Sequence, residues 1–485
     1  MGLRIYNSLT RQLEEFAPLQ EGKVLMYSCG PTVYDYFHIG NARTFLVSDV
    51  VRRYLESKDY AVKLVQNLTD IDDKIINRAN EQGIDATQLA QKYVDAYFED
   101  SRQLGIRPAD VHPKATAHVP EIIEMIQALI AKGAAYPVEG DVYYRIRRFA
   151  DYGKISHRDI DDLLAGARVE VNERKEEARD FDLWKCSKPG EPSWDSPWGK
   201  GRPGWHIECS AMVMKHLGET IDIHAGGQDL QFPHHENEIA QSEIVTGKPF
   251  ARYWMHVAFL RVDGRRMGKS EKNFLFVRDA LREYSPEAIR HFLISAQYRH
   301  PLDYNATSLR ESSSAIRRLN NGLDALKPYQ AAHQRKLDEN ALNPAEASLL
   351  QSIDAMRNGF EAAMDDDFNT AGAIGAIFKF IGEVNQFFAG VGNQPSEGRE
   401  IVLGKAYESL SRVCSVLGIH SEKEASRDEN VVLVDQLMAL ILDVRQDARQ
   451  RKDWATSDKI RARLNQLHVE LQDSRHGTTW KRASS

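Results

Sequence analysis

The hydrophobic pattern near the N-terminus predicts a strand, a helix and a second strand, in that order. Residues 23–28 form a short apolar run that ends before a Gly-Pro pair, which is typical of a buried strand stopping at a turn. Further on, apolar residues recur at near-helical spacing: Phe45, Val47, Val50, Val51 and Tyr54. Residues 62–65 are apolar again and predict the next strand. This order predicts a parallel α/β unit, in which ligands bind at the carboxyl ends of the strands.

The pattern changes over residues 139–204, where tryptophans and prolines break any periodicity and indicate an irregular inserted region. The α/β pattern resumes with a strand predicted at residues 221–224, and helical spacing dominates from about residue 308. A short strand is predicted at residues 469–471. Two segments are predicted as loops or linkers: 391–400 and 421–430. We therefore expect an α/β fold, then an α-helical C-terminal region and a small α+β unit.

Composition narrows the class of protein. The 485 residues suggest roughly three domains at about 150 residues each, and 42% hydrophobic with 27% charged residues is ordinary for a globular protein. No apolar stretch approaches the length of a membrane span, and no signal segment precedes the first strand, so we expect a cytoplasmic protein without membrane association. Four cysteines without close spacing argue against a disulfide scaffold.

Two short segments carry residues suited to binding phosphate. In residues 38–41, His-Ile-Gly-Asn, Gly40 beside a predicted helix start allows close approach of a nucleotide, and His38 can donate to a phosphate oxygen. In residues 266–270, Arg-Met-Gly-Lys-Ser, two cations and a hydroxyl can hold a leaving pyrophosphate. Each segment alone fits a plainer interpretation, a loop histidine beside a turn glycine or a solvated basic turn. Together, and in this order, they favour an ATP site.

These segments resemble the two signatures of the class I aminoacyl-tRNA synthetases, the HIGH motif and the KMSKS loop. Four further segments narrow the resemblance to the cysteinyl-tRNA synthetase family: residues 29–35, 67–74, 199–212 and 232–241. The resemblance runs from about Ile5 to Trp480. Asn41 departs from the fourth HIGH position, and Arg266 and Gly268 depart from the KMSKS loop. Lys269 is retained, so we expect an active enzyme whose loop contributes differently to the rate.

The resemblance implies one zinc ion per chain, on a set of four ligands: Cys29, Cys209, His234 and Glu238. The chemistry agrees, because zinc accepts sulfur, nitrogen and oxygen ligands. If a helix starts at Pro233, His234 and Glu238 share one face, and His235 and Glu236 point elsewhere. The alternative is that the thiols are core residues and the His/Glu pair a surface interaction. Zinc would bind a substrate thiolate but not serine's hydroxyl, so no editing domain would be needed.

The remaining site residues follow from the resemblance. It implies His38 and Lys269 as catalytic residues. It implies contacts with ATP, which carries Mg2+, by His38, Gly40, Asn41, Asp229, Arg266, Lys269 and Ser270. It implies contacts with the substrate by Cys29, Gly30, Thr69 and Trp205. A buried structural role is the alternative for Trp205, and helix capping is the alternative for Thr69 and Asp70.

The resemblance also implies a division of the chain into regions. Residues 1–250 would form a Rossmann-like catalytic domain with an insertion at about 115–204, and residues 251–307 a signature-loop and stem-contact region. Residues 308–420 would form a helical bundle domain, and residues 421–485 an anticodon-binding domain. Within the last region, residues 443–485 hold ten Lys or Arg against six Asp or Glu, and two tryptophans, which suits unpaired bases. A solvated amphipathic helix is the alternative.

The function implied is that of a cysteine–tRNA ligase, acting as a monomer on cysteine, ATP and tRNA(Cys). Two alternatives are a cysteine ligase of the mycothiol pathway, which shares the activation core but lacks an anticodon-binding domain, and a non-catalytic tRNA-binding paralogue. The long C-terminal region argues against the first alternative, and the retained His38 and Lys269 argue against the second.

Overall fold

The computed structural model describes the chain apart from residues 1, 159–173, 268–273, 391–395, 421–424, 452, 468, 475–476 and 483–485. The chain divides into two compact units, residues 1–420 and residues 421–485. No helix in the described part of the chain is both long and apolar enough to cross a bilayer.

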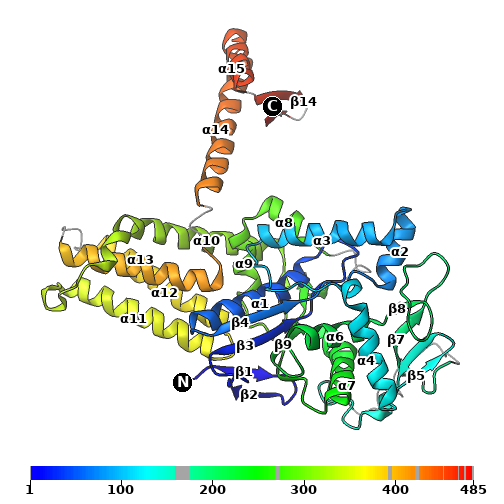
Figure 1. Ribbon diagram of the computed structural model, residues 1–485. Coiled ribbons are helices and arrows are strands. Elements are labelled where there is room, and N and C mark those ends of the chain that lie inside the picture. The colour runs from blue at the N-terminus through cyan, green and yellow to red at the C-terminus, as the bar shows by residue number, and fades with distance from the viewer. Residues whose placement is uncertain are drawn as a thin grey trace. The chain divides into compact units, whose positions relative to one another are not determined.

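A four-stranded parallel sheet lies in the larger unit, in the order β10-β9-β3-β4 (Figure 1). Its strands are β3 (Lys23–Ser28), β4 (Ala61–Gln66), β9 (Ile221–Gly227) and β10 (Ala251–Val257). The first six residues of β9 are buried, as expected for a parallel strand covered on both faces. The α/β fold and the strands predicted at residues 23–28, 62–65 and 221–224 are confirmed.

Alternate residues of β3 pack against different helices. The helices that cover the sheet are α1 (Ile39–Ser57), α4 (Val119–Ala131), α6 (Trp205–His216) and α7 (Glu236–Thr246). Val24 and Met26 belong to the hydrophobic cluster that contains α1, whereas Tyr27 and Cys29 belong to the cluster that contains α4, α6 and α7. Side chains alternate between the two faces of a strand. Cys29 therefore points toward the α6 and α7 side.

The chain between β4 and β9 adds helices and a second sheet. The helices are α2 (Asp73–Gln82), α3 (Ala86–Gln103) and α4. The antiparallel sheet contains β5 (Ala135–Val138), β6 (Asp141–Tyr144), β7 (Phe181–Cys186) and β8 (Gly201–Pro203). The prediction that residues 139–204 are irregular was wrong for β6, β7 and β8, and residues 159–173 lie outside the described residues. These strands are three to six residues long, so too few positions were available for alternation to be visible.

A small sheet follows the central one. It pairs β11 (Leu260–Val262) in parallel with β13 (Leu302–Tyr304) and antiparallel with β12 (Arg265–Arg266). Between β12 and β13 in sequence lie α8 (Val277–Glu283) and α9 (Pro286–Leu293). The signature segment predicted at residues 266–270 thus starts at the end of β12.

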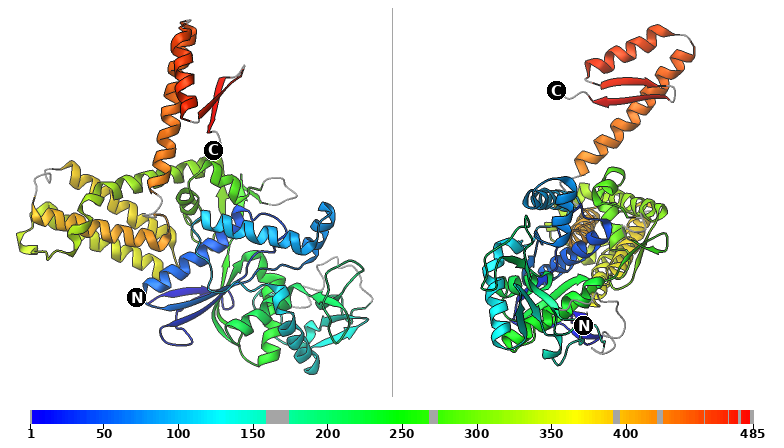
Figure 2. Two further views of the ribbon diagram at one scale, coloured as in Figure 1. Left: turned by 45° about the horizontal axis from the view of Figure 1, so that its top comes forward. Right: turned by 90° about the vertical axis from the view of Figure 1, so that its right-hand side faces the viewer.

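Four long helices form the rest of the larger unit and pack side by side (Figure 2). They are α10 (Ala306–Leu326), α11 (Pro344–Asp365), α12 (Thr370–Ala389) and α13 (Glu397–Leu417). The predicted helical region is confirmed. Residues 391–395 lie outside the described residues, and the loop predicted at residues 391–400 was wrong for residues 397–400. Ser396 caps α13 by accepting a hydrogen bond from Arg399 N, so the helix begins at Glu397.

The smaller unit contains two helices and a hairpin. Its elements are α14 (Ala425–Gln450), α15 (Trp454–Gln466), β14 (Val469–Ser474) and β15 (Gly477–Arg482). The strand predicted at residues 469–471 is confirmed, and it pairs antiparallel with β15. Residues 421–424 lie outside the described residues, and the loop predicted at residues 421–430 was wrong for the rest, because α14 begins at Ala425. Its first turns are polar and charged, so they lack the apolar periodicity that marked the later turns.

Asp367 joins the helical region to the N-terminal strand β1 (Arg4–Asn7), which pairs with β2 (Gln12–Glu15). Its buried carboxylate accepts hydrogen bonds from Tyr6 N at 2.8 Å, Tyr298 Oη at 2.7 Å, Arg299 Nε at 2.6 Å and Gln297 Nε2 at 3.0 Å. Its φ of 59° lies in the left-handed region, which aspartate and asparagine tolerate better than most residues. One side chain thus fastens three segments far apart in sequence.

We expect Asp367→Ala to lower the free energy of unfolding of the larger unit by about 3–5 kcal/mol, because four donors lose a buried acceptor. Asp367→Asn should lose less, since its amide oxygen still accepts and asparagine adopts the same φ. The matched control is Asp366→Ala, which breaks a half-exposed ion pair with Arg4 and should cost no more than about 1 kcal/mol. Urea unfolding followed by tryptophan fluorescence measures all three. Equal losses at positions 366 and 367 would contradict this account.

Candidate active site

A pocket of about 340 Å³ opens at the carboxyl end of the parallel sheet. Residues at the ends of all four strands line it: Cys29 after β3, Asn67 after β4, Gly227 in β9 and Val257 in β10. Parallel strands end at one edge of a sheet, so this geometry follows from the strand directions. The expectation that Cys29 and His38 lie at a ligand site of this kind agrees with the pocket lining.

Four buried side chains at one end of the pocket bring their ligand atoms within 4.8 Å of one another. Cys29 follows β3 and Cys209 lies in α6. His234 lies in the helical turn Gln231–His235 that leads into α7, and Glu238 lies four positions later in the first turn of α7. His234 Nε2 is 3.0 Å from Glu238 Oε1, and Cys29 Sγ is 3.7 Å from the same oxygen. Two sulfurs, one imidazole nitrogen and one carboxylate oxygen form a donor set that fits zinc. The structure brings together all four residues predicted as ligands.

Charge is unevenly distributed within this group. Burial raises the pKa of Cys29. The pKa of Cys209 is lowered to about 6, first by the hydrogen bond from Cys29 and also by His234. Burial opposes ionisation of both His234 and Glu238, but the attraction between them outweighs it. The pKa of His234 is therefore raised to about 10. The pKa of Glu238 is lowered to about 2, because His224 and His234 both stabilise its carboxylate. A metal ion bound here would displace the proton from His234, because a ligating imidazole must be neutral.

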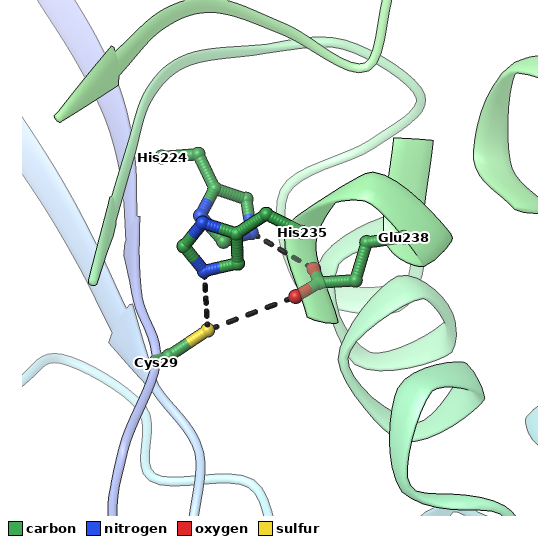
Figure 3. A group of neighbouring side chains, drawn as sticks. All are labelled: Cys29, His224, His235 and Glu238. Carbon is green, nitrogen blue, oxygen red and sulfur yellow. Dashed lines mark hydrogen bonds and ion pairs between the residues drawn. The ribbon is translucent and has the colours of Figure 1, made fainter. Parts of the chain in front are cut away.

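A second group of ligand atoms shares Cys29 and Glu238 and adds His224 and His235 (Figure 3). His224 Nε2 lies 2.9 Å from Glu238 Oε2, and His235 Nε2 lies 3.3 Å from Cys29 Sγ. The prediction that His235 points elsewhere was therefore wrong. The helix starts irregularly, with non-helical backbone at Phe232, so ideal helical geometry did not apply there. Glu236 does point away: it accepts hydrogen bonds from Ser156.

The pocket distinguishes the two groups. Cys29, Cys209 and His234 line the pocket, whereas His224 and His235 lie behind them and are fully buried. An ion in the first group would face the pocket and could accept a further ligand from it. His224 and His235 are placed to orient Glu238 and Cys29 from behind, the role that outer hydrogen-bond partners have in metal sites.

Residues 38–41 shape the opposite end of the pocket. His38 is the N-cap of α1: its Nδ1 accepts a hydrogen bond from Asn41 N at 3.2 Å, and Asn41 Oδ1 accepts one from His38 N at 3.4 Å. Both side chains line the pocket, and so does Gly40. A Cβ atom on Gly40 would lie 2.6 Å from Met267 Cε, so the start of the signature loop packs on this helix start. The two signature segments, far apart in sequence, are in contact.

The predicted substrate residues are held in the pocket wall by close contacts. Gly30 N donates to Asn67 Oδ1 at 2.7 Å, and a Cβ there would lie 1.7 Å from Asn67 O, so no larger residue fits without backbone movement. Thr69 donates to Glu208 Oε2 at 3.1 Å. The Trp205 ring lies 4.4 Å from that of His234, centroid to centroid. All of these except Glu208 line the pocket, as does Asp229.

Some predicted residues are placed differently or cannot be placed. Asp70 is outside the pocket lining; its carboxylate accepts from Thr116 N and Thr116 Oγ1, and Asp72 caps α2 instead. Lys269 and Ser270 lie outside the described residues. Arg266 is described only as a backbone position of β12. Their roles remain predictions.

Two histidines behind the ligand group, His224 and His256, were not predicted from the sequence. His224 lies in β9 and His256 in β10, and His235 Nδ1 is 2.8 Å from His256 Nε2. All three are buried. Histidines inside otherwise apolar strands are unusual, because a buried imidazole requires partners. That feature of residues 221–227 and 251–257 was the signal available in the sequence.

Comparisons with known proteins identify the family. The family described as "tRNA synthetases class I (C) catalytic domain" matches residues 15–314, and the DALR domain matches residues 359–421. The cysteine–tRNA ligase of Bacillus licheniformis is 48% identical over 485 residues, covering all of both chains. That of Symbiobacterium thermophilum is 50% identical over 488 residues, again with full coverage of both chains.

Solved structures agree on the fold. A Mycobacterium tuberculosis methionyl-tRNA synthetase in complex with methionyl-adenylate has a TM-score of 0.59 and 14% identity, over 82% of this chain and 90% of that chain. A putative arginyl-tRNA synthetase from Campylobacter jejuni has a TM-score of 0.58 and 14% identity, over 84% and 94%. Relatives that match over the full length are about half identical to this chain, the catalytic-domain family matches residues 15–314, and the fold is shared. The chain therefore belongs to the cysteine–tRNA ligase family of class I aminoacyl-tRNA synthetases.

Proposed function

We propose that this protein activates cysteine with ATP to form cysteinyl-adenylate and pyrophosphate, and then transfers the cysteinyl group to tRNA(Cys). The observation that carries the proposal is the pocket itself. A donor set of two thiols, an imidazole and a carboxylate lies at one end, and the start of α1 with His38 and Gly40 lies at the other. A thiol site and a phosphate site in one cavity suit the joining of cysteine to ATP.

The four-ligand group accounts for the choice of amino acid. A zinc ion held there would act as a Lewis acid that binds a substrate thiolate well and serine's hydroxyl poorly. Cys29, Cys209, His234 and Glu238 would hold the ion, while Trp205, packed on His234, forms the adjoining wall. Serine has nearly the same shape as cysteine but lacks the thiol. A site whose selectivity depends on coordination of that thiol rejects serine without a separate editing site.

The other end of the pocket would act on ATP, which enters with Mg2+. The cysteine carboxylate attacks the α-phosphate, and pyrophosphate leaves. His38, fixed by its cap contact with Asn41, would donate to a phosphate oxygen as negative charge develops, and Lys269 would stabilise the leaving group. Gly40 keeps the helix start accessible, and Asp229 offers an acceptor to the ribose or the amino group.

The remaining regions would serve the second step. The terminal hydroxyl of tRNA attacks the acyl carbon of the adenylate and releases AMP. We assign residues 421–485 to anticodon binding, because their cations and the exposed Trp454 suit phosphates and unpaired bases. The amino-sugar ligase and the non-catalytic paralogue are not favoured, since the resemblance to cysteine–tRNA ligases extends over the full length. Cysteine-dependent ATP–pyrophosphate exchange followed by charging of tRNA(Cys) tests the whole proposal; absence of either activity from the folded, zinc-loaded protein contradicts it.

We expect Cys29→Ala to lose zinc and to lower the rate of cysteine activation by about 100-fold or more. Loss of even an outer hydrogen-bond partner of a metal ligand costs about 10- to 100-fold in metal affinity or activity, and Cys29 would be a ligand itself. The preference for cysteine over serine should fall with it. Cys414→Ala is the matched control, a buried thiol in α13 away from the pocket. Elemental analysis and pyrophosphate exchange with both amino acids measure the result. Undiminished rejection of serine by a zinc-free variant would overturn the role of zinc.

His224→Ala should weaken zinc binding by about 10- to 100-fold, because Glu238 loses the donor that orients its second oxygen. Competition with a chromophoric chelator measures the zinc Kd without any assay of activity. The control is His291→Ala, another buried histidine, which contacts Ser312 rather than the ligand group. Equal zinc affinity in the two variants would show that His224 has no part in holding Glu238.

Removal of residues 421–485 should leave pyrophosphate exchange within about twofold of the full chain while raising the KM for tRNA(Cys), because all residues assigned to activation lie before residue 271. Circular dichroism checks that residues 1–420 remain folded. A folded, truncated protein that charges tRNA with an unchanged KM would refute the anticodon assignment.

A further inference from the structure

Arg43 is a fully buried arginine in the second turn of α1, five positions after His38. It makes no ion pair with the described residues. Its guanidinium instead donates to three backbone carbonyls: Nη1 to Ala258 O at 3.0 Å and to His300 O at 2.8 Å, and Nη2 to Gln297 O at 3.2 Å. Burial lowers the pKa of Arg43 to about 10. A buried charge without an acid is costly, so this arrangement requires an explanation beyond packing.

The three carbonyls belong to the two segments that lead into the parallel strand pair β11–β13. Ala258 comes two residues before β11 and lines the pocket, and His300 comes two residues before β13. Ala258 N also donates to Tyr298 O at 2.9 Å, which joins the two segments directly. Arg43 therefore fastens the base of this strand pair to the helix that begins at His38.

The same strand pair carries the signature loop. β11 turns into β12, β12 ends at Arg266, and Met267 then packs against Gly40. Helix α1 and the β11–β13 pair thus meet at two places: at the base through Arg43, and at the pocket through Gly40 and Met267. A shift at the base would displace the signature loop relative to His38.

Lysine cannot reproduce this contact. Arginine presents several donors in a rigid planar fork, whereas lysine has a single flexible ammonium group, so the three carbonyls in two segments would no longer be held at a fixed spacing. The thiol end of the pocket should be less affected, because Cys29 packs on the opposite face of the sheet from α1.

We propose that Arg43 is a positioning residue for adenylate formation, which holds the strand pair leading to the signature loop at the correct distance from His38. This inference rests on the function proposed above. Arg43 acts through the loop and touches no substrate.

The test compares Arg43→Lys with Arg290→Lys. Arg290 is an equally buried arginine that also fastens α1, through Asp49 Oδ2 at 3.0 Å, and that donates to the carbonyls of Gly105 and Leu417 at 2.8 and 3.0 Å. Both substitutions should lower the unfolding midpoint. Only Arg43→Lys should lower kcat for pyrophosphate exchange, by about 10- to 100-fold, with the KM for cysteine within about twofold of the unsubstituted protein. Rates are divided by the number of active sites, counted from the burst of adenylate formation.

A double-mutant cycle tests whether the effect passes through the loop. In a Lys269→Ala background, Arg43→Lys should lower kcat by less than about twofold further, because the loop's contribution is already lost. Arg43→Gln, which avoids burying a charge, should reproduce the kcat loss of Arg43→Lys if the lysine variant folds poorly. The inference is overturned if kcat is unchanged in both Arg43 variants. It is also overturned if the effects of Arg43→Lys and Lys269→Ala on kcat multiply in the double variant. Failure of the unsubstituted protein to activate cysteine would instead refute the proposed function.

Discussion

The shared edge of the parallel sheet is the constraint on which the site depends. Cys29 N donates to Ala225 O at 3.0 Å, so the end of β3 is held against β9, and β9 continues to Gly227 at the pocket. Parallel strands all end on one side, which brings segments some 200 residues apart in sequence to one cavity. The alternation of side chains in β3 then directs Cys29 toward α6 and α7, where Cys209 and Glu238 lie.

Burial controls the electrostatics of that cavity. Glu238 is completely buried, yet its pKa is lowered, because His224 and His234 contact its two oxygens and outweigh the cost of burial. A metal cation bound by the group would likewise compensate its anionic ligands, since a charge in a low-dielectric region requires compensation. The histidines behind the ligands are therefore part of the site, even though they do not reach the pocket.

The two ends of the pocket are held by different parts of the fold. The thiol end depends on β3, α6 and α7, and the nucleotide end depends on α1 and the strand pair β11–β13. Asp367 and Arg43 connect the nucleotide end to the helical region, because Gln297 contacts both of them. These hydrogen bonds link the helical region to the elements that would act on ATP.

By itself, the sequence determined the strands at residues 23–28, 62–65 and 221–224, the helical region and the family, because local periodicity and long specific segments need no knowledge of distant contacts. It also named four ligands that the structure brings together. Only the tertiary structure decided that His224 and His235 lie behind those ligands, that Met267 rests on Gly40, and that Arg43 holds two strand starts. These contacts depend on strand register and on an irregular helix start at Phe232, neither of which leaves a periodic signal in the chain. The short strands of the insertion escaped prediction for the same reason: their pairing partners, rather than their own residues, define them.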